Sequence, residues 1–512
     1  MNEKFEMVAK TFKGLEGVLA DELRALGAED VTEGIRMVAF NGDKELLYKA
    51  NFCLRTALRV LKPIYKFRSD NVDDLYEQVK LFNWDDVLSV DKTFSIDATT
   101  FGEEFSHSRF VTYRVKDAIV DYFSERYDKR PSIRITNPDI RLDVHISGDE
   151  VTLSLDSSGE PLYKRGWREA QTDAPINEVL AAGIIKLSGW DGNSNFVDPM
   201  CGSGTFLVEA ALIAANINPG VYRKGFAFQQ WPDYDEELFD NIYNDDSAER
   251  EFKYKIYGSD INGKAIAISR ANVKSAGVSK MVELELKAIE DITEAPEAGV
   301  LITNPPYGER LQVGNIEQLY NTIGEKLKKV YRGYNAWIIG YSRDHFDAIG
   351  LRSSLRYPLN NGALECELRQ YVRFDGSFKD MRGRGESIKN NDFRASEDRR
   401  TIQRREFRET FDRNDRPRRD DRRDDHPRRD ERPRFDRNDR PRRDDRRDDR
   451  PRFDRNDRPR FDDRDARRPY RPFNREPQLG ADKEVTIVHG RRKSWMRRDI
   501  NEHDENYGKN KD

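Results

Sequence analysis

From about residue 172 onward, short apolar segments with the character of strands alternate with longer segments of helical spacing. The strand-like segments lie at 196–198, 257–260, 282–286, 300–303 and 336–340, and the helical segments lie at 177–187, 205–216, 264–276 and 316–330. Parallel strands need a crossover between them, usually a helix, so this alternation predicts a doubly wound, mostly parallel α/β sheet. The turn Asn360–Gly362 between two further apolar segments predicts an antiparallel hairpin at the close of the sheet.

The residues ahead of this region predict two smaller units that mix strands and helices. In residues 1–60, the segments 5–9 and 35–40 have the pattern of strands. In residues 15–26, and again from residue 44, apolar residues recur at helical spacing. In residues 61–160, strand signals at 93–100, 140–146 and 151–155 accompany a helical segment at 110–123. We therefore expect domains at 1–60, 61–160 and 161–375.

The globular pattern stops after about residue 376. The segment 411–425 recurs in full at 435–449 and in part at 453–460, and each full copy contains six arginines and six aspartates. With almost no apolar surface to bury, residues 376–512 are expected to form a disordered tail, with a short basic motif at 485–498. The arginines could give the tail a weak RNA affinity that depends on salt. The interleaved aspartates reduce that attraction, so a tail that is only an inert solvated spacer is an equally good reading.

Charge and cysteine usage limit the classes of partner. The net charge is −4, so any contact with nucleic acid must come from local basic patches. Cys53, Cys201 and Cys366 are far apart and form no disulfide or zinc spacing, and the six histidines show no metal spacing either. No apolar stretch approaches the roughly 18 residues that span a bilayer. We expect a cytoplasmic protein with no metal and no membrane anchor.

A glycine-containing loop follows the first strand of the predicted sheet. In Asp198–Phe206, Gly202 and Gly204 permit a tight turn and a close approach of the backbone to a ligand. Asp260 ends the next strand, where a carboxylate can bind both hydroxyls of a ribose. Together these features predict an adenosine-containing ligand, although Asp260 can also be read as a helix N-cap.

The sequence Asn304-Pro305-Pro306-Tyr307 follows the strand at 300–303. The side-chain carbonyl of Asn304 and the backbone carbonyl of Pro305 can both accept hydrogen bonds from an amino group. The prolines, Pro305 and Pro306, stiffen the loop and remove N–H donors, and Tyr307 offers a face on which a base can stack. The motif therefore predicts a site that holds the exocyclic amine of a base.

Together these motifs resemble a known enzyme family. Asp198–Phe206, Gly258–Asn262 and Asn304–Tyr307 resemble motifs I, II and IV of class I S-adenosylmethionine-dependent methyltransferases. The segment Thr172–Asn177 is similar to the one that covers the cofactor in that family, except that Asn177 stands where the family pattern implies a lysine. The resemblance implies a Rossmann-like sheet and S-adenosylmethionine as cofactor.

The amino-terminal residues extend the resemblance. Residues 45–160, with Asn51–Ala57 and Phe105–Phe123, resemble a THUMP RNA-binding module behind a ferredoxin-like leader. Residues 1–375 as a whole, and the extended motif Asn304–Arg310, resemble the RlmL-type guanine-N2 methyltransferases of large-subunit ribosomal RNA. Some of those relatives carry a second methyltransferase domain, whereas the Arg/Asp tail follows here.

The residues implied by this resemblance fall into three groups. The catalytic group is Asn304, Pro305, Pro306 and Tyr307. The cofactor-binding group is Thr172, Pro175, Asp198, Pro199, Cys201, Gly202, Gly204, Thr205, Asp260, Ile261 and Asp291. The RNA-binding group is Arg109, Arg114 and Lys116, cations near aromatic residues that an ordinary solvated helix face would explain equally well.

The favoured function is therefore methylation of a guanine N2 amine in large-subunit (23S) ribosomal RNA, with the modified nucleotide and the oligomeric state left open. An alternative is an adenine-N6 methyltransferase on DNA or RNA, because the same motif serves that amine. A second alternative is a non-catalytic RNA-binding or ribosome-assembly factor with a methyltransferase fold. The activated methyl group requires mainly positioning of the nucleophile, so no strong general base is expected.

Overall fold

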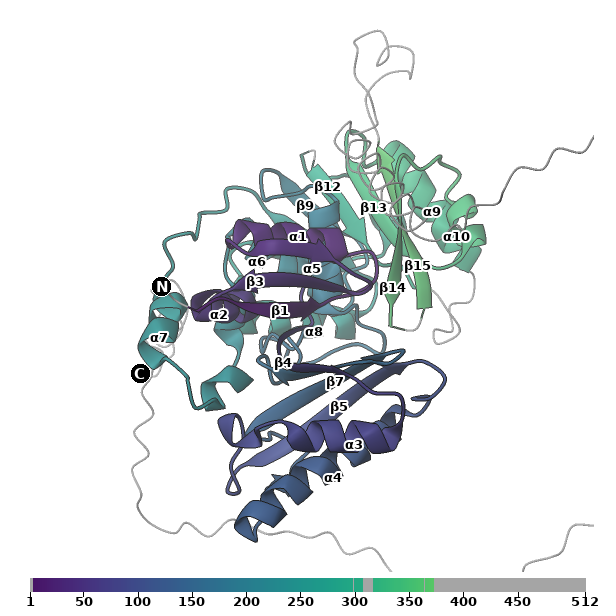
Figure 1. Cartoon of the computed structure of the whole chain (residues 1–512). Coiled ribbons are helices and arrows are strands. Elements are labelled where there is room, and N and C mark those ends of the chain that lie inside the picture. Colours follow the sequence, from purple (N-terminus) through teal and green to yellow (C-terminus); the bar gives the residue numbers. More distant parts are fainter. Residues whose placement is uncertain (1–2, 298, 307–315, 363, 373–512) are drawn as a thin grey trace, which may run out of the picture. The chain divides into compact units, whose positions relative to one another are not determined.

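The computed structural model describes residues 3–297, 299–306, 316–362 and 364–372 (Figure 1). The predicted tail at 376–512 and Tyr307 lie outside these ranges. Within them the strands form an eight-stranded sheet in the first half and a seven-stranded sheet in the second. No helix in the described ranges has both the length and the apolar composition to cross a membrane.

The first sheet has the strand order β2-β3-β1-β4-β8-β7-β5-β6. Its strands are β1 (Phe5–Lys10), β2 (Glu29–Glu33), β3 (Met37–Gly42), β4 (Arg59–Arg68), β5 (Thr93–Phe101), β6 (Ser132–Ile133), β7 (Ile140–Ser147) and β8 (Glu150–Asp156). Strand β4 pairs antiparallel with both β1 and β8. The two predicted amino-terminal units therefore share one sheet, and the predicted boundary near residue 60 falls inside β4.

The helices of the first half follow the apolar spacing of the sequence. They are α1 (Glu16–Ala25), α2 (Lys44–Cys53), α3 (Val72–Leu81), the 3-10 turn η1 (Trp84–Asp86) and α4 (Ser108–Tyr127). Asp43 begins α2 by accepting a hydrogen bond from Leu46 N, and Asn71 caps α3 in the same way. Helices α3 and α4 pack together beneath β5 and β7 (Figure 1).

The second sheet has the order β11-β10-β9-β12-β13-β15-β14, and it confirms the predicted doubly wound fold. Its strands are β9 (Asn195–Asp198), β10 (Ile256–Asp260), β11 (Val282–Leu286), β12 (Gly299–Thr303), β13 (Asn335–Gly340), β14 (Arg356–Asn361) and β15 (Leu364–Val372). Strands β9 to β13 run parallel, and the hairpin β14–β15 is antiparallel, as expected. The carboxyl ends of β9, β10 and β12 therefore meet at one edge.

Helices flank this sheet, and an insert separates two of them. The helices are α5 (Glu178–Leu187), α6 (Thr205–Ala214), α8 (Gly263–Ser275), η4 (Ile289–Asp291), α9 (Ile316–Lys329) and α10 (Arg343–Ala348). Between α6 and β10 the insert forms η2 (Pro219–Tyr222), η3 (Ala227–Gln230) and α7 (Glu236–Asn244). No pattern in the sequence predicts this insert.

The insert belongs to the hydrophobic core of the first half. Phe226, Phe228 and Phe239 from the insert are buried in the same cluster as residues from β1, α2 and β4. The rings of Tyr48 and Phe228 stack with their centroids 4.4 Å apart, and Asp235 N donates to the Tyr48 hydroxyl at 3.0 Å. The two halves of the described chain are thus connected through shared apolar packing.

A buried ionic cluster reinforces this connection. The Arg165 Nε donates to Glu209 Oε1 at 3.3 Å, and both side chains are almost completely inaccessible to solvent. Arg165 also donates to the backbone oxygen of Arg55, and Arg55 donates to the backbone oxygen of Ile217 at 2.8 Å. Glu209 lies on α6, so its carboxylate holds the segment that joins the two sheets.

Candidate active site

The glycine loop lies between β9 and α6 and is fixed by backbone hydrogen bonds. Cys201 N donates to Ser259 O at 2.9 Å, which holds the loop against β10. Gly202 and Gly204 have φ angles of 54° and 77°. A Cβ atom at Gly204 would lie 3.0 Å from the Ser269 hydroxyl oxygen. A side chain at Gly204 would therefore be both strained and crowded, which fits a loop that brings bare backbone close to a ligand.

Asp260 lies directly beside the glycine loop. Its Oδ2 accepts from Gly202 N at 3.0 Å and its Oδ1 from Asn262 N at 2.8 Å. The N-cap of α8 is Asn262, which accepts from Lys264 N at 2.9 Å. The helix-cap reading of Asp260 is therefore wrong, because the N-cap lies two residues later and the helix begins at Gly263. The carboxylate is instead held at the loop, where a ribose would lie if the loop binds an adenosine.

Exposed aliphatic side chains lie next to this carboxylate. Ile261 is 73% exposed and Leu286, which is paired with Asp260 in the sheet register, is 60% exposed. A Cβ atom on Gly263 would lie 3.8 Å from Leu286, so this apolar surface is continuous with the start of α8. Apolar surface beside a hydroxyl-binding carboxylate suits a planar base joined to a ribose.

Asp198 connects the glycine loop to the next strand. Its Oδ1 accepts from the Thr303 hydroxyl at 2.8 Å and from Met200 N at 3.2 Å, and both Asp198 and Thr303 are fully buried. Burial raises the pKa of the Asp198 carboxyl to about 7 and the charge of Asp260 adds to this, while the two hydrogen bonds oppose it. The bond joins the end of β9 to the residue just before Asn304.

Replacing Asp198 with asparagine should change how stability depends on pH. The ordinary pKa is 3.8 and the folded value is about 7. Between these pH values the folded state holds a proton that the unfolded state has released, so stability falls as pH rises through this window. Asparagine removes this titration. Urea unfolding from pH 4 to 7.5 should show a shallower decline for Asp198→Asn than for the parent, and parallel profiles would contradict it.

Asn304 and the two prolines follow β12 at the same edge. The Asn304 Oδ1 atom is buried and accepts no hydrogen bond from the described part of the chain. Pro305 is buried and Pro306 is half-buried, whereas Tyr307 lies outside the described residues. A buried acceptor without a donor costs free energy unless a ligand supplies the donor. The amide oxygen is thus placed for an incoming N–H group.

Residues 168–170, just ahead of the segment 172–177 predicted to cover the cofactor, are held against the glycine loop by contacts that no sequence pattern indicated. Arg168 donates to the hydroxyls of Ser203 and Thr205 at 3.2 and 2.9 Å. Asn272 on α8 accepts from Glu169 N at 2.9 Å and donates to Ser203 O at 2.9 Å. These contacts connect positions that lie from 35 to 103 residues apart, so no local pattern shows them.

The remaining predicted cofactor residues lie around this loop. The Thr172 hydroxyl oxygen would be 3.8 Å from a Cβ atom at Gly202, and Pro175 is half-buried in the covering segment. Pro199 O accepts from the Ser259 hydroxyl, and the buried Cys201 thiol lies 3.8 Å from the Ser269 hydroxyl. Asp291 is exposed in η4, beyond the end of β11. Asn177 accepts from Val179 N at 2.9 Å and caps α5.

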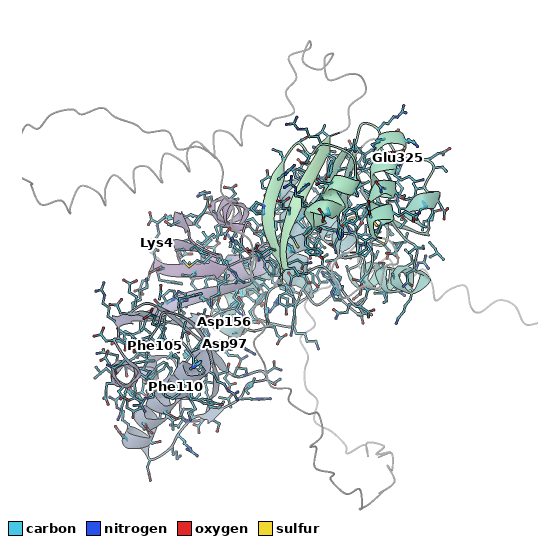
Figure 2. The ribbon with its side chains drawn as sticks, turned by 90° about the vertical axis from the view of Figure 1, so that its right-hand side faces the viewer. Lys4, Asp97, Phe105, Phe110, Asp156 and Glu325 are labelled. Carbon is cyan, nitrogen blue, oxygen red and sulfur yellow. The ribbon has the colours of Figure 1, made fainter. Side chains whose placement is uncertain are left out.

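The predicted RNA-binding cations on α4 differ in their surroundings. Arg114 pairs with Asp73 at 2.7 Å and lies over the Tyr76 ring, and Lys116 pairs with Asp117 at 2.5 Å. Arg109 forms no ion pair within the described ranges and lies beside Tyr113, whose ring is 50% exposed. Its neighbour in the chain, Phe110, is 57% exposed and is labelled in Figure 2. The cation–aromatic surface is therefore centred on Arg109.

Three family models match the chain in succession. Residues 6–61 match the RlmL ferredoxin-like domain, residues 69–156 the THUMP domain, and residues 165–370 the RMKL-like methyltransferase domain.

Curated relatives cover most of the same residues. A protein of Synechocystis sp., provisionally named as an RNA methyltransferase, is 39% identical over 366 residues, which are 71% of this chain and 95% of the relative. The ribosomal RNA large subunit methyltransferase K/L of Syntrophotalea carbinolica is 40% identical over 72% of this chain and 54% of its own length. The chain thus spans about half the length of the K/L relatives.

Solved structures share the fold over the same part of the chain. A provisionally assigned methyltransferase in complex with SAH is 31% identical with a TM-score of 0.66, and the match covers 74% of this chain and 100% of that one. A structure from Listeria monocytogenes, titled as a predicted N6-adenine-specific DNA methylase, is 30% identical with a TM-score of 0.65 and covers 72% and 97% of the two chains.

Proposed function

The chain belongs to the RMKL-like methyltransferase family with THUMP and RlmL ferredoxin-like domains, and from this membership we propose that it methylates the exocyclic N2 amine of a guanine in large-subunit ribosomal RNA with S-adenosylmethionine as donor. The choice of an exocyclic amine rests on the buried Asn304 Oδ1, which accepts no hydrogen bond from the described residues. The printed names of the K/L relatives support ribosomal RNA as substrate.

The residues at the sheet edge fit S-adenosylmethionine. Gly202 and Gly204 leave the backbone bare, Asp260 offers carboxylate oxygens for the ribose hydroxyls, and Ile261 offers apolar surface for the adenine. When bound, the cofactor supplies a methyl group already activated by its sulfonium centre. We assign the covering role to Thr172–Asn177, which lies just after the residues 168–170 that are held at the loop through Arg168 and Asn272.

The proposed role of Asn304 is to orient and polarise the amine. Its Oδ1 and the Pro305 carbonyl accept the two N–H bonds, which directs the nitrogen lone pair away from these oxygens. Both acceptors also stabilise the positive charge that develops on the nitrogen, and the proton is then lost to water. The base must leave its stack to reach them, at a cost of a few kcal/mol, and Pro306 provides surface to hold it.

Adenine N6 is the second candidate, because the similar structure from Listeria monocytogenes is described as a predicted N6-adenine-specific DNA methylase. The two acceptors at Asn304 and Pro305 serve either amine. Incubation with labelled cofactor and, separately, unmodified ribosomal RNA, transfer RNA and DNA, followed by digestion to nucleosides, decides between them. N2-methylguanosine from ribosomal RNA supports the proposal, whereas N6-methyladenine from any substrate overturns the choice of base.

Replacing Asp260 with alanine should weaken cofactor binding by about 10- to 100-fold, because charge-assisted hydrogen bonds contribute about 1.5–3 kcal/mol. Isothermal titration calorimetry with S-adenosylmethionine measures the effect. Asp240→Ala, which removes an exposed carboxylate on α7, is the matched control and should bind like the parent. Equal affinities for the two variants would refute the assignment, and absence of binding by the parent would support a non-catalytic assembly factor.

A further inference from the structure

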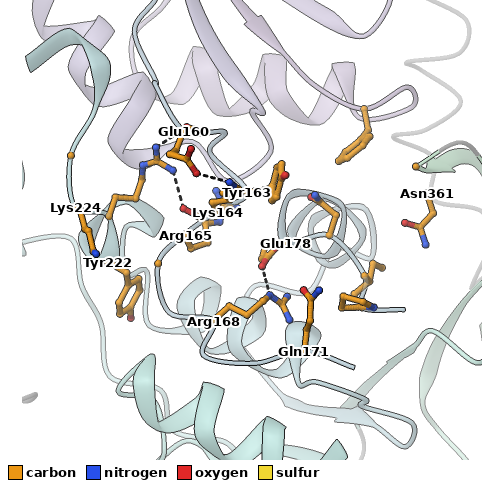
Figure 3. Close-up of a pocket in the computed structure, with 18 residues that line it drawn as sticks. Glu160, Tyr163, Lys164, Arg165, Arg168, Gln171, Glu178, Tyr222, Lys224 and Asn361 are labelled. Carbon is orange, nitrogen blue, oxygen red and sulfur yellow. Dashed lines mark hydrogen bonds and ion pairs between the residues drawn. The ribbon is translucent and has the colours of Figure 1, made fainter. Parts of the chain in front are cut away.

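A cavity of about 740 Å³ is lined in part by Arg168, which also contacts the glycine loop (Figure 3). Its walls come from the segments 160–168, 171–178 and 222–225, from Phe12, and from the tip of the β14–β15 hairpin at Asn361 and Gly362. The cavity is thus built from parts of the chain that are far apart in sequence, and it shares residues 175–177 with the segment proposed to cover the cofactor.

Cations outnumber carboxylates in the lining. Three of the cations are neutralised, in the pairs Lys164–Glu160 at 2.6 Å, Arg165–Glu209 at 3.3 Å and Arg168–Glu178 at 2.6 Å. Arg223 and Lys224 have no carboxylate partner within the described ranges. The cavity therefore carries a local positive excess, although the chain as a whole has a net charge of −4.

The two unpaired cations have different characters. Arg223 donates to four backbone carbonyl oxygens within residues 158–164, at 2.7 to 3.2 Å, so its guanidinium is fixed in place. Burial lowers the pKa of Arg223 to about 10, which still leaves it charged at neutral pH. Lys224 is exposed and lies in the lining next to Arg223. A fixed charge and a mobile ammonium group together suit a phosphodiester.

Aromatic and amide groups complete the lining. Phe12 and Tyr163 are partly exposed in the cavity, and the Gln171 amide is exposed at its rim. Partly exposed rings next to cations are the combination that binds single-stranded nucleic acid, since bases stack on the rings while phosphates contact the cations. An isolated anion would use the cations alone.

The cavity lies at the sheet edge that carries Asn304. In the hairpin, Glu367 pairs with Gly340 at the carboxyl end of β13, so the tip at Asn361–Gly362 extends beyond that edge. Arg168 lines the cavity and also donates to Ser203 in the glycine loop. The cavity and the cofactor loop therefore share a wall.

We propose that this cavity binds a single-stranded segment of the RNA substrate next to the target nucleotide, with Lys224 contacting its phosphates, Arg223 adding fixed positive charge, and Phe12 or Tyr163 stacking a base. The inference rests on the proposed RNA methyltransferase function and adds a site for the RNA chain itself. It assigns part of the RNA affinity to the methyltransferase domain in addition to the surface around Arg109.

Reversal of one charge tests the cavity. Lys224→Glu in the full chain should raise the Kd for unmodified ribosomal RNA by about tenfold and reduce the salt dependence of binding by about one phosphate contact. Lys253→Glu is the matched control, because Lys253 is exposed in the same domain, makes no ion pair within the described ranges and lies outside the cavity. Its Kd should stay within about twofold of the parent. Affinity for S-adenosylmethionine should be the same in both variants.

A second measurement locates the RNA directly. The photoreactive residue p-benzoylphenylalanine in place of Tyr163 should crosslink to the RNA, whereas the same residue in place of Tyr254, which is 43% exposed outside the cavity, should not. The cavity proposal is overturned if the two lysine variants bind RNA with equal affinity and no crosslink forms at Tyr163, provided that the parent still methylates RNA. A parent that neither binds nor methylates RNA instead removes the proposed function on which the inference rests.

Discussion

Asn304→Ala is expected to lower the rate of methyl transfer by about 100- to 1,000-fold in single-turnover assays, while the affinity for S-adenosylmethionine stays unchanged. The variant removes the buried Oδ1 acceptor proposed to stabilise the charge that develops on the amine, and loss of one such group costs rates of this size. Asn304 makes no hydrogen bond to the glycine loop among the described residues, so the cofactor should bind as before.

Two further variants sharpen this test. Asn304→Asp keeps an acceptor oxygen at the same position and should retain more activity than the alanine variant. Asn321→Ala removes an exposed amide from α9 and should react like the parent. Unaltered single-turnover rates in Asn304→Ala would remove the acceptor role from the mechanism. A matching loss of cofactor affinity would show that the loop has moved.

Glu209→Ala is expected to lower the free energy of unfolding by about 3–5 kcal/mol, because it leaves a buried guanidinium without its counter-charge. Arg165 and Glu209 are 2% and 0% exposed, and Arg55 is buried close by. Burial raises the pKa of Glu209, and Arg165 opposes that rise. The carboxylate therefore compensates for the burial of cationic side chains in the segment between the two sheets.

Urea unfolding of the full chain measures this loss. The matched control is Glu45→Ala, which breaks the half-exposed pair with Lys49 on α2 and should cost less than about 1 kcal/mol. If Glu209→Ala loses no more free energy of unfolding than the control, then solvent or other groups already compensate the charge of Arg165.

The sheet of the second half could be predicted because its signals are local. Strands β9, β12 and β13 are short and mostly apolar, and the flanking helices show the apolar spacing in the sequence itself. Strand β4 escaped prediction because it contains Pro63 and alternates poorly, yet it joins the two amino-terminal units. Pairing between strands that are far apart in sequence leaves no mark in a local pattern.

The candidate site was predictable to a similar degree. Asp198 and Asp260 each end a strand and Asn304 directly follows one, and parallel strands bring such ends to one edge. The positioning contacts of Arg168 and Asn272 could not be anticipated, since each joins segments that meet through tertiary folding. The pairing of Arg114 with Asp73, 41 residues away, was hidden for the same reason.

The insert at 219–244 limits how this architecture can be inherited. Its aromatic rings fill the core beneath the amino-terminal strands, although its residues come from within the catalytic domain's own stretch of sequence. A recombination that grafted a foreign leader onto residues 165–372 would leave Phe228 and Phe239 facing mismatched partners. We therefore expect the amino-terminal residues and the insert to be exchanged together between genes. Their sequences should coevolve, although the codons of the two segments lie far apart.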